Sequence, residues 1–229
     1  MPKPRILIIN PNSSLEMTAA IDRNAQAFAA GDLEVTTVHT PGAAPFVATY
    51  EDQFKAAAGM IELVRNNSAK YDAFIVACHA DPNLDLMKEV STKPVVGIAE
   101  ASMKLASMLG HCFSVIGPVD KSSANKQALV DKYGLSRELA SVRAADLEAG
   151  NTLEDKLIAA GRKAITQDGA EVLVLGCAGF AGLDKRMEQE LGVPVLDGVI
   201  SALIIAAGLV KYQCSISKVR RYRSGEFSL

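Results

Sequence analysis

Short runs of apolar residues alternate along the chain with longer segments in which apolar residues recur at helical spacing. Few charges interrupt the runs, which is typical of strands that are buried on both faces of a sheet. Regular alternation of such strands with helices indicates βαβ units and parallel sheets. The pattern therefore predicts an α/β protein whose strands lie at residues 5–9, 33–38, 73–77, 94–98, 112–116, 171–175 and 194–196.

Aspartates stand before several of the predicted helices. Asp81 precedes Pro82, an order typical of a capping side chain followed by the first residue of a helix. Asp52, Asp120 and Asp197 lie where other helices are expected to begin.

The second half of the chain repeats the order of the first. Residues 72–78 and residues 170–177 both read as an apolar strand that ends on a cysteine, Cys78 or Cys177, and each is followed at nearly the same distance by Pro-Val. Upstream, residues 5–14 and 113–123 both read as a strand, a proline and a Ser-Ser pair. The repeat predicts two similar α/β lobes, near residues 1–97 and 98–207.

The two cysteines occupy equivalent places in the repeat. Each lies just past the carboxyl end of a predicted strand, the edge at which parallel sheets bind ligands. If the lobes are related by a pseudo-twofold axis, Cys78 and Cys177 approach one cleft from opposite sides.

Two thiols on opposite sides of a carbon acid can invert its stereocentre. One removes a proton from one face and the other returns a proton to the opposite face. Cysteine suits this task because its ordinary pKa of about 8.5 falls at the positive end of a helix. Backbone N–H groups of His79, Ala80, Ala178 and Gly179 are candidates to hold the negative charge of the enolate.

Composition narrows the class of protein. Of the 229 residues 49% are hydrophobic and the net charge is −2, which disfavours both a disordered chain and a nucleic-acid-binding protein. A basic cluster occurs only near the end, at Lys218, Arg220, Arg221 and Arg223. We interpret this tail as solvated or as a subunit contact.

The sequence lacks the motifs that would indicate secretion, a membrane span or a bound cofactor. The first apolar run is too short for a signal peptide and the longest is too short for a membrane span, so we expect a cytoplasmic protein with no membrane partner. The four cysteines are widely spaced and include no Cys-x-x-Cys pair, which in a reducing compartment argues against both disulfides and a zinc site. The glycines at 176, 179 and 182 do not have the dinucleotide-binding spacing, and no lysine motif for a nucleotide or pyridoxal phosphate is present, so no cofactor is expected. No set of His, Asp and Glu residues has the spacing of metal ligands, so no metal is expected.

Four segments together resemble the aspartate/glutamate/hydantoin racemase superfamily, and most of all its hydantoin and allantoin racemase branch. They are Asn-Pro-Asn-Ser at 10–13, Ala-Cys-His-Ala-Asp-Pro at 77–82, Gly-Ile-Ala-Glu-Ala at 97–101 and Leu-Gly-Cys-Ala-Gly at 175–179. The resemblance covers nearly the whole chain. It implies two flavodoxin-like lobes, with residues 208–229 packing back on the first lobe, and a homo-oligomer.

The resemblance also implies a reaction and a site. The reaction is cofactor-independent racemisation of a small molecule, a 5-substituted hydantoin or allantoin, with Cys78 and Cys177 as the two bases. The implied pocket is lined by the Asn-Pro pair after the first strand, by the residues that follow each cysteine and by the loops at 45–47 and 117–118. In these two loops, and in the two residues after the first cysteine, the sequence departs from the branch at positions that face the substrate. The pocket residues are Asn10, Pro11, Phe46, His79, Ala80, Gly117, Pro118, Ala178 and Gly179.

Several alternatives stay open from the sequence. Either cysteine can be a small buried apolar residue, His79 can transfer a proton or shape a wall, and Glu100 can reach the cleft or begin a helix. A maleate isomerase or an aspartate or glutamate racemase of the same superfamily is a rival enzyme. A noncatalytic binding protein with the same cleft is the rival from another class.

Overall fold

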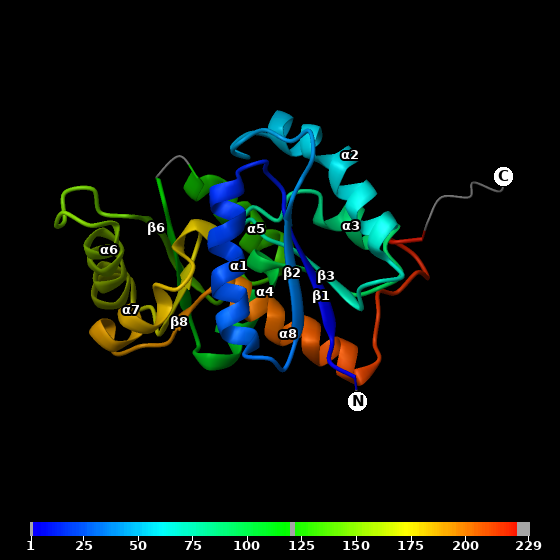
Figure 1. Ribbon diagram of the computed structural model, residues 1–229. Helices are drawn as coiled ribbons and strands as arrows, with labels where there is room; N and C mark the ends of the chain where they lie inside the picture. Colours follow the sequence, from blue (N-terminus) through cyan, green and yellow to red (C-terminus); the bar gives the residue numbers. More distant parts are fainter. Residues whose placement is uncertain (1, 120–121, 224–229) are drawn as a thin grey trace. The chain divides into compact units, whose positions relative to one another are not determined.

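The computed structural model describes residues 2–119 and 122–223, and Figure 1 traces them. The strands are β1 (Arg5–Asn10), β2 (Glu34–His39), β3 (Ala73–Val76), β4 (Val95–Gly97), β5 (Phe113–Gly117), β6 (Leu139–Ala144), β7 (Val172–Leu175) and β8 (Val195–Leu196). The helices are α1 (Leu15–Ala29), α2 (Tyr50–Asn67), α3 (Leu84–Val90), α4 (Ile98–Leu109), α5 (Ser123–Tyr133), α6 (Leu153–Asp168), the 3-10 helix η2 (Ala178–Phe180), α7 (Asp184–Leu191) and α8 (Gly198–Tyr212).

The strands form two parallel sheets with the same internal order. The first sheet has the order β2-β1-β3-β4 and the second has the order β6-β5-β7-β8, with every neighbouring pair parallel. The prediction of an α/β chain with two similar parallel sheets is therefore confirmed. In each sheet the first and third strands in chain order are neighbours, so the loops that leave their carboxyl ends start side by side.

One strand was not predicted. β6 lies at the edge of the second sheet, and each of its residues is only half-buried. Its sequence, Leu-Ala-Ser-Val-Arg-Ala, lacks the continuous apolar run that marked the other strands. The run is absent because an edge strand is covered less completely than a central one, so polar side chains such as Ser141 and Arg143 are accommodated there.

The chain divides into two compact units. Unit 1 consists of Met1–Gly97 and the segment that begins at Ala202, and unit 2 consists of Ile98–Ser201. In unit 1, α2 and α3 cover one face of the first sheet. Leu7, Ile9, Phe74 and Val76 from the strands form one buried cluster there with Met60 of α2 and its neighbours.

Unit 2 buries both faces of its sheet. Phe113 and Val115 of β5 pack with Met103 of α4 on one face. On the other face Ile116 and Leu173 pack with α6 and α7. The two central strands β5 and β7 therefore alternate their side chains between two apolar layers, as parallel strands covered by helices do.

The C-terminal segment binds within unit 1. The ammonium group of Lys218 donates to the carbonyl oxygens of Lys88 at 2.6 Å and Glu89 at 2.7 Å, at the end of α3. Tyr222 donates to the Asp85 carboxylate at 2.8 Å, and the red segment of Figure 1 runs from α8 to this helix. The interpretation of this tail as solvated or as a subunit contact is thus wrong for Lys218. Residues 224–229 lie outside the described part of the chain.

Among the helix starts that the sequence predicted and the structure describes, two are confirmed and one is wrong. Thr49 and Asp52 form a capping box at α2, and Asp197 accepts the N–H groups of Val199 and Ile200 at the start of α8. The predicted cap at Asp81 is wrong, because α3 begins only at Leu84 and its N-cap residue is Asn83. The predicted start at Asp120 lies outside the described residues.

No helix within residues 2–119 and 122–223 combines the length and the apolar character that crossing a membrane requires.

Candidate active site

The Asn-Pro turn after β1 is held by a buried network of polar side chains. The Asn10 side chain is completely buried and donates to Asn12 Oδ1 at 2.8 Å and to Thr18 Oγ1 at 2.9 Å. The Thr40 hydroxyl donates to the Asn10 carbonyl at 2.8 Å. Both amide hydrogens of Asn10 are therefore used within the turn, which fixes the backbone at the carboxyl end of β1.

Cys78 follows the strand beside β1. The N–H of Ala77 donates to the Ile9 carbonyl at 2.9 Å, so the chain stays in register with β1 up to the residue before the cysteine. Cys78 is partly exposed and His79 is 3% exposed. The Cys78 carbonyl accepts the N–H of Asp81 at 2.9 Å, which closes a tight turn directly after the thiol.

Asp81 connects this turn to the end of β4. Its backbone has a left-handed φ of 43°, and its carboxylate is buried against Gly97. A Cβ atom at Gly97 would lie 2.4 Å from Cγ of Asp81. The missing side chain at Gly97 is thus the space that the Asp81 carboxylate occupies.

Cys177 stands at the corresponding place in unit 2. The N–H of Gly176 donates to the Ile116 carbonyl at 2.8 Å, as Ala77 does to Ile9 in unit 1. Cys177 is the N-cap residue of the 3-10 helix η2, and its sulfur accepts the N–H of Gly179 at 3.4 Å. The Cys177 sulfur is therefore in contact with a backbone donor of the loop that follows it.

The structure groups the predicted site residues by unit. In unit 1 the turn at Asn10 and Pro11 lies beside the loop that carries Cys78, His79 and Ala80, because β1 and β3 are paired.

In unit 2 Gly117 and Pro118 lie beside the loop that carries Cys177, Ala178 and Gly179, because β5 and β7 are paired. Phe46 belongs to the loop that follows β2, which is joined to the turn after β1 by the hydrogen bond from the Ser13 N–H to the Ala44 carbonyl at 3.0 Å. It is 56% exposed in the loop before α2.

The other two cysteines have different surroundings. The thiol of Cys112 donates to the Gly169 carbonyl at 2.9 Å, at the start of β5 rather than at its carboxyl end. Cys214 lies in the segment that follows α8. Glu100 is in the first turn of α4 and pairs with Lys104 at 2.9 Å, which accords with the helix-start interpretation.

A buried aspartate holds the corresponding strand end in unit 2. Asp197 follows β8, and besides capping α8 it accepts the N–H of Gly182 at 3.4 Å, in the loop after Cys177. Burial raises the pKa of this carboxyl above its ordinary value of 3.8, while the N–H groups of Ile200, Val199 and Gly182 oppose the shift.

The Asp197 carboxyl predicts a pH-dependent stability difference. Because its pKa is raised in the folded state, its contribution is fully present below about pH 4 and is lost as the pH rises through the raised value. Asp197→Asn keeps an acceptor oxygen and does not titrate. The free energy of unfolding of this variant relative to wild type is therefore expected to rise between about pH 4 and pH 7. Urea unfolding at a series of pH values measures it, and a constant difference would contradict the expectation.

Sequence reasoning missed a lysine beside Cys177. Lys126 of α5 is 5% exposed, and its ammonium group donates to the Gly176 carbonyl at 2.5 Å. A signal was present, because Lys126 and Val130 are four residues apart and both face the interior from α5. In a helix with little apolar patterning that signal is weak.

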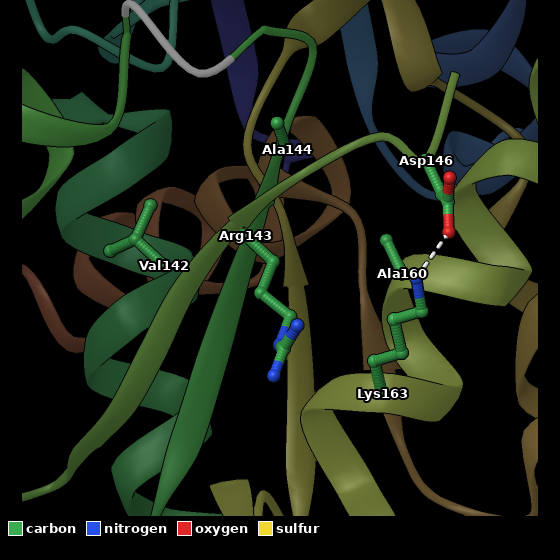
Figure 2. Close-up of a pocket in the computed structure, with 6 residues that line it drawn as sticks. All are labelled: Val142, Arg143, Ala144, Asp146, Ala160 and Lys163. Carbon is green, nitrogen blue, oxygen red and sulfur yellow. Dashed lines mark hydrogen bonds and ion pairs between the residues drawn. The ribbon is translucent and has the colours of Figure 1, made fainter. Parts of the chain in front are cut away.

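A hollow of about 280 Å³ opens at the edge of the second sheet, near β6. Figure 2 shows Arg143 and Ala144 of β6 on one side and the ion pair between Asp146 and Lys163 on the other. Neither Cys78 nor Cys177 lines it. In the ranges 2–119 and 122–223, no three His, Cys, Asp or Glu side chains are grouped so that they could hold a metal ion.

Comparison with known proteins identifies the family of the chain. Residues 6–205 match the model of the Asp/Glu/Hydantoin racemase family. The chain belongs to this family, which places it among the isomerases.

Individual relatives are similar over most of their length. A hydantoin racemase of Pseudomonas sp. (strain NS671) is 36% identical over 97% of this chain and 92% of its own. The structure of an allantoin racemase from Klebsiella pneumoniae superposes with a TM-score of 0.91 at 34% identity, over 98% of this chain and 94% of its own. An allantoin racemase from Pseudomonas fluorescens superposes with a TM-score of 0.89 at 32% identity, over 97% of both chains.

Proposed function

We propose that the protein is a cofactor-independent racemase of a five-membered cyclic ureide, a 5-substituted hydantoin or allantoin. One observation carries the proposal: Cys78 and Cys177 occupy the same position after the third strand of two sheets that have the same strand order. The names of the similar proteins, hydantoin racemase and allantoin racemase, support this substrate class.

In the proposed reaction the cysteines act on opposite faces of C5 of the ring. One sulfur, as thiolate, takes the proton from C5, and the electron pair moves to the neighbouring carbonyl oxygen to form an enolate. The other cysteine, as thiol, then gives its proton to the opposite face. After the reaction the first cysteine is a thiol and the second is a thiolate. Substrate and product differ only in configuration, so no oxidant or reductant is needed.

The chain offers hydrogen-bond donors for each charged species. The N–H of Gly179 is directed at the Cys177 sulfur, where it stabilises the thiolate. Backbone N–H groups at His79 and Ala80 of one loop and at Ala178 of the other are the proposed donors to the enolate oxygen, since their small neighbours permit close approach. Asn10 and Thr18 contribute indirectly, by fixing the turn beside the Cys78 loop.

A panel of optically pure substrates in deuterated water tests the proposal. We expect at least one 5-substituted hydantoin, or allantoin, to lose optical rotation while deuterium enters C5, because the returned proton comes from a thiol that has exchanged with solvent. Polarimetry and proton NMR follow the two changes in one sample. An uncatalysed control corrects for spontaneous racemisation.

Two results would contradict the proposal. Conversion of maleate, or racemisation of aspartate or glutamate, with no action on any cyclic ureide would assign a different substrate class. Protection of Cys78 and Cys177 from alkylation by a ureide that is never turned over would identify a binding protein.

A further inference from the structure

Lys126 is placed directly behind Cys177. Its side chain leaves α5, is 5% exposed, and ends with its ammonium group 2.5 Å from the carbonyl oxygen of Gly176. The Gly176 carbonyl and the Cys177 N–H belong to one peptide group. The ammonium group therefore binds one end of the peptide whose other end carries the cysteine.

Two glycines make room for this lysine. A Cβ atom on Gly117 would lie 2.9 Å from Cε of Lys126, and one on Gly176 would lie 3.0 Å from the same atom. Gly117 ends β5 and Gly176 follows β7, so Lys126 is enclosed by the carboxyl ends of two paired strands. These are the strand ends from which the unit 2 part of the active site is proposed to be built.

Packing alone does not account for a charged group here. An ammonium group loses most of its hydration when it is buried, whereas methionine has nearly the same length and fills the same space without that cost. A positive charge held at a strand end beside a nucleophilic sulfur is, by contrast, suited to stabilising negative charge that develops nearby.

We propose that Lys126 is a positioning residue for the Cys177 side of the active site. Its ammonium group fixes the Gly176–Cys177 peptide and polarises it, which strengthens the Cys177 N–H as a donor, and its charge favours anions at this strand end. The species stabilised are the Cys177 thiolate and the enolate of the substrate. The catalytic part of this inference rests on the proposed racemase function, whereas its electrostatic part can be measured without turnover.

The electrostatic part is measured by alkylating Cys177 with two reagents of different charge. Iodoacetate is an anion and iodoacetamide is neutral, and both react with the thiolate. The ratio of their rates therefore cancels the fraction of thiolate and any general change in access. Mass spectrometry of the peptide that contains Cys177 separates it from the other three cysteines.

We expect Lys126→Met to lower the iodoacetate-to-iodoacetamide ratio at Cys177 by about threefold or more. Lys126→Arg keeps the positive charge and should keep most of the ratio. Lys163→Met is the matched control, because it removes the same charge from an exposed ion pair with Asp146 in the same unit and should leave the ratio unchanged. An unchanged ratio in Lys126→Met would overturn the inference.

Wild-type protein provides a second measurement that does not depend on the folding of a variant. The ratio at Cys177 should be higher in the native protein than in the same protein unfolded in urea, where Lys126 is far from the sulfur. A native ratio equal to or below the unfolded one would overturn the inference even if Lys126→Met failed to fold.

Turnover separates this inference from the proposed function. On a racemised ureide, Lys126→Met should lower kcat by about tenfold or more with a smaller change in KM, and Lys126→Arg should recover part of kcat. If no ureide is racemised but the alkylation ratio falls in Lys126→Met, the racemase proposal fails. The electrostatic effect of Lys126 on Cys177 is then still supported. If ureides are racemised and the ratio does not change, the inference on Lys126 alone fails.

Discussion

Replacing either Cys78 or Cys177 with serine is expected to lower the rate of racemisation by about 10²- to 10⁴-fold. A serine hydroxyl at neutral pH is not ionised, so it cannot accept the C5 proton as a thiolate does, and it is a poorer donor in the reverse direction. The loss should occur from both enantiomers, because each cysteine is base in one direction and acid in the other. Polarimetry that starts from each enantiomer separately measures it.

Cys112→Ser is the matched control for these variants. The Cys112 thiol donates to the Gly169 carbonyl, and a serine hydroxyl can make the same hydrogen bond. We expect this variant to racemise at nearly the wild-type rate. Full activity of Cys78→Ser or Cys177→Ser would exclude two-base catalysis and leave one cysteine, or neither, in the reaction.

Gly97→Ala is expected to lower both the free energy of unfolding, by about 1 to 3 kcal/mol, and the activity. The new Cβ would overlap the Asp81 carboxylate, which is buried and cannot move into water without opening its turn. That turn carries Cys78, whose carbonyl accepts the Asp81 N–H. Urea unfolding and steady-state kinetics on the same preparation measure the two losses.

Gly208→Ala provides the comparison for this substitution. No atom lies within 4 Å of a Cβ at Gly208, which is exposed in α8. Alanine is favoured over glycine inside a helix, so a gain of up to about 1 kcal/mol in unfolding free energy is expected without loss of activity. Equal effects at Gly97 and Gly208 would show that the space occupied by Asp81 has no special role.

Most of the fold could be predicted because its strands are buried on both faces. Strands such as β1, β3 and β7 are continuous apolar runs, which parallel sheets covered by helices require. β6 escaped prediction since an edge strand needs no such run. The repeat nevertheless indicated a strand at this place, because β2 of the first half requires an equivalent strand in the second half, and β6 is that strand.

The site was predictable where a residue's neighbours in sequence determine its place. Cys78 and Cys177 each lie two residues after the last residue of their strand, so strand prediction was enough to put both at carboxyl ends. Lys126 was missed because its position depends on Gly117 and Gly176, which approach it only in the folded chain. The same limitation explains why Asp81 was wrongly predicted to cap a helix. Its carboxylate instead occupies the space left by the missing side chain of Gly97, which is distant in sequence.

The division of the chain has a consequence for synthesis on the ribosome. Unit 2 is one continuous stretch, whereas unit 1 is interrupted and is completed by the segment that begins at Ala202. Lys218 and Tyr222 secure α3 only after all of unit 2 has been translated. Unit 1 therefore lacks its C-terminal segment at a time when the whole sequence of unit 2 has already been synthesised. Unit 2 can complete its fold first, although unit 1 begins the chain.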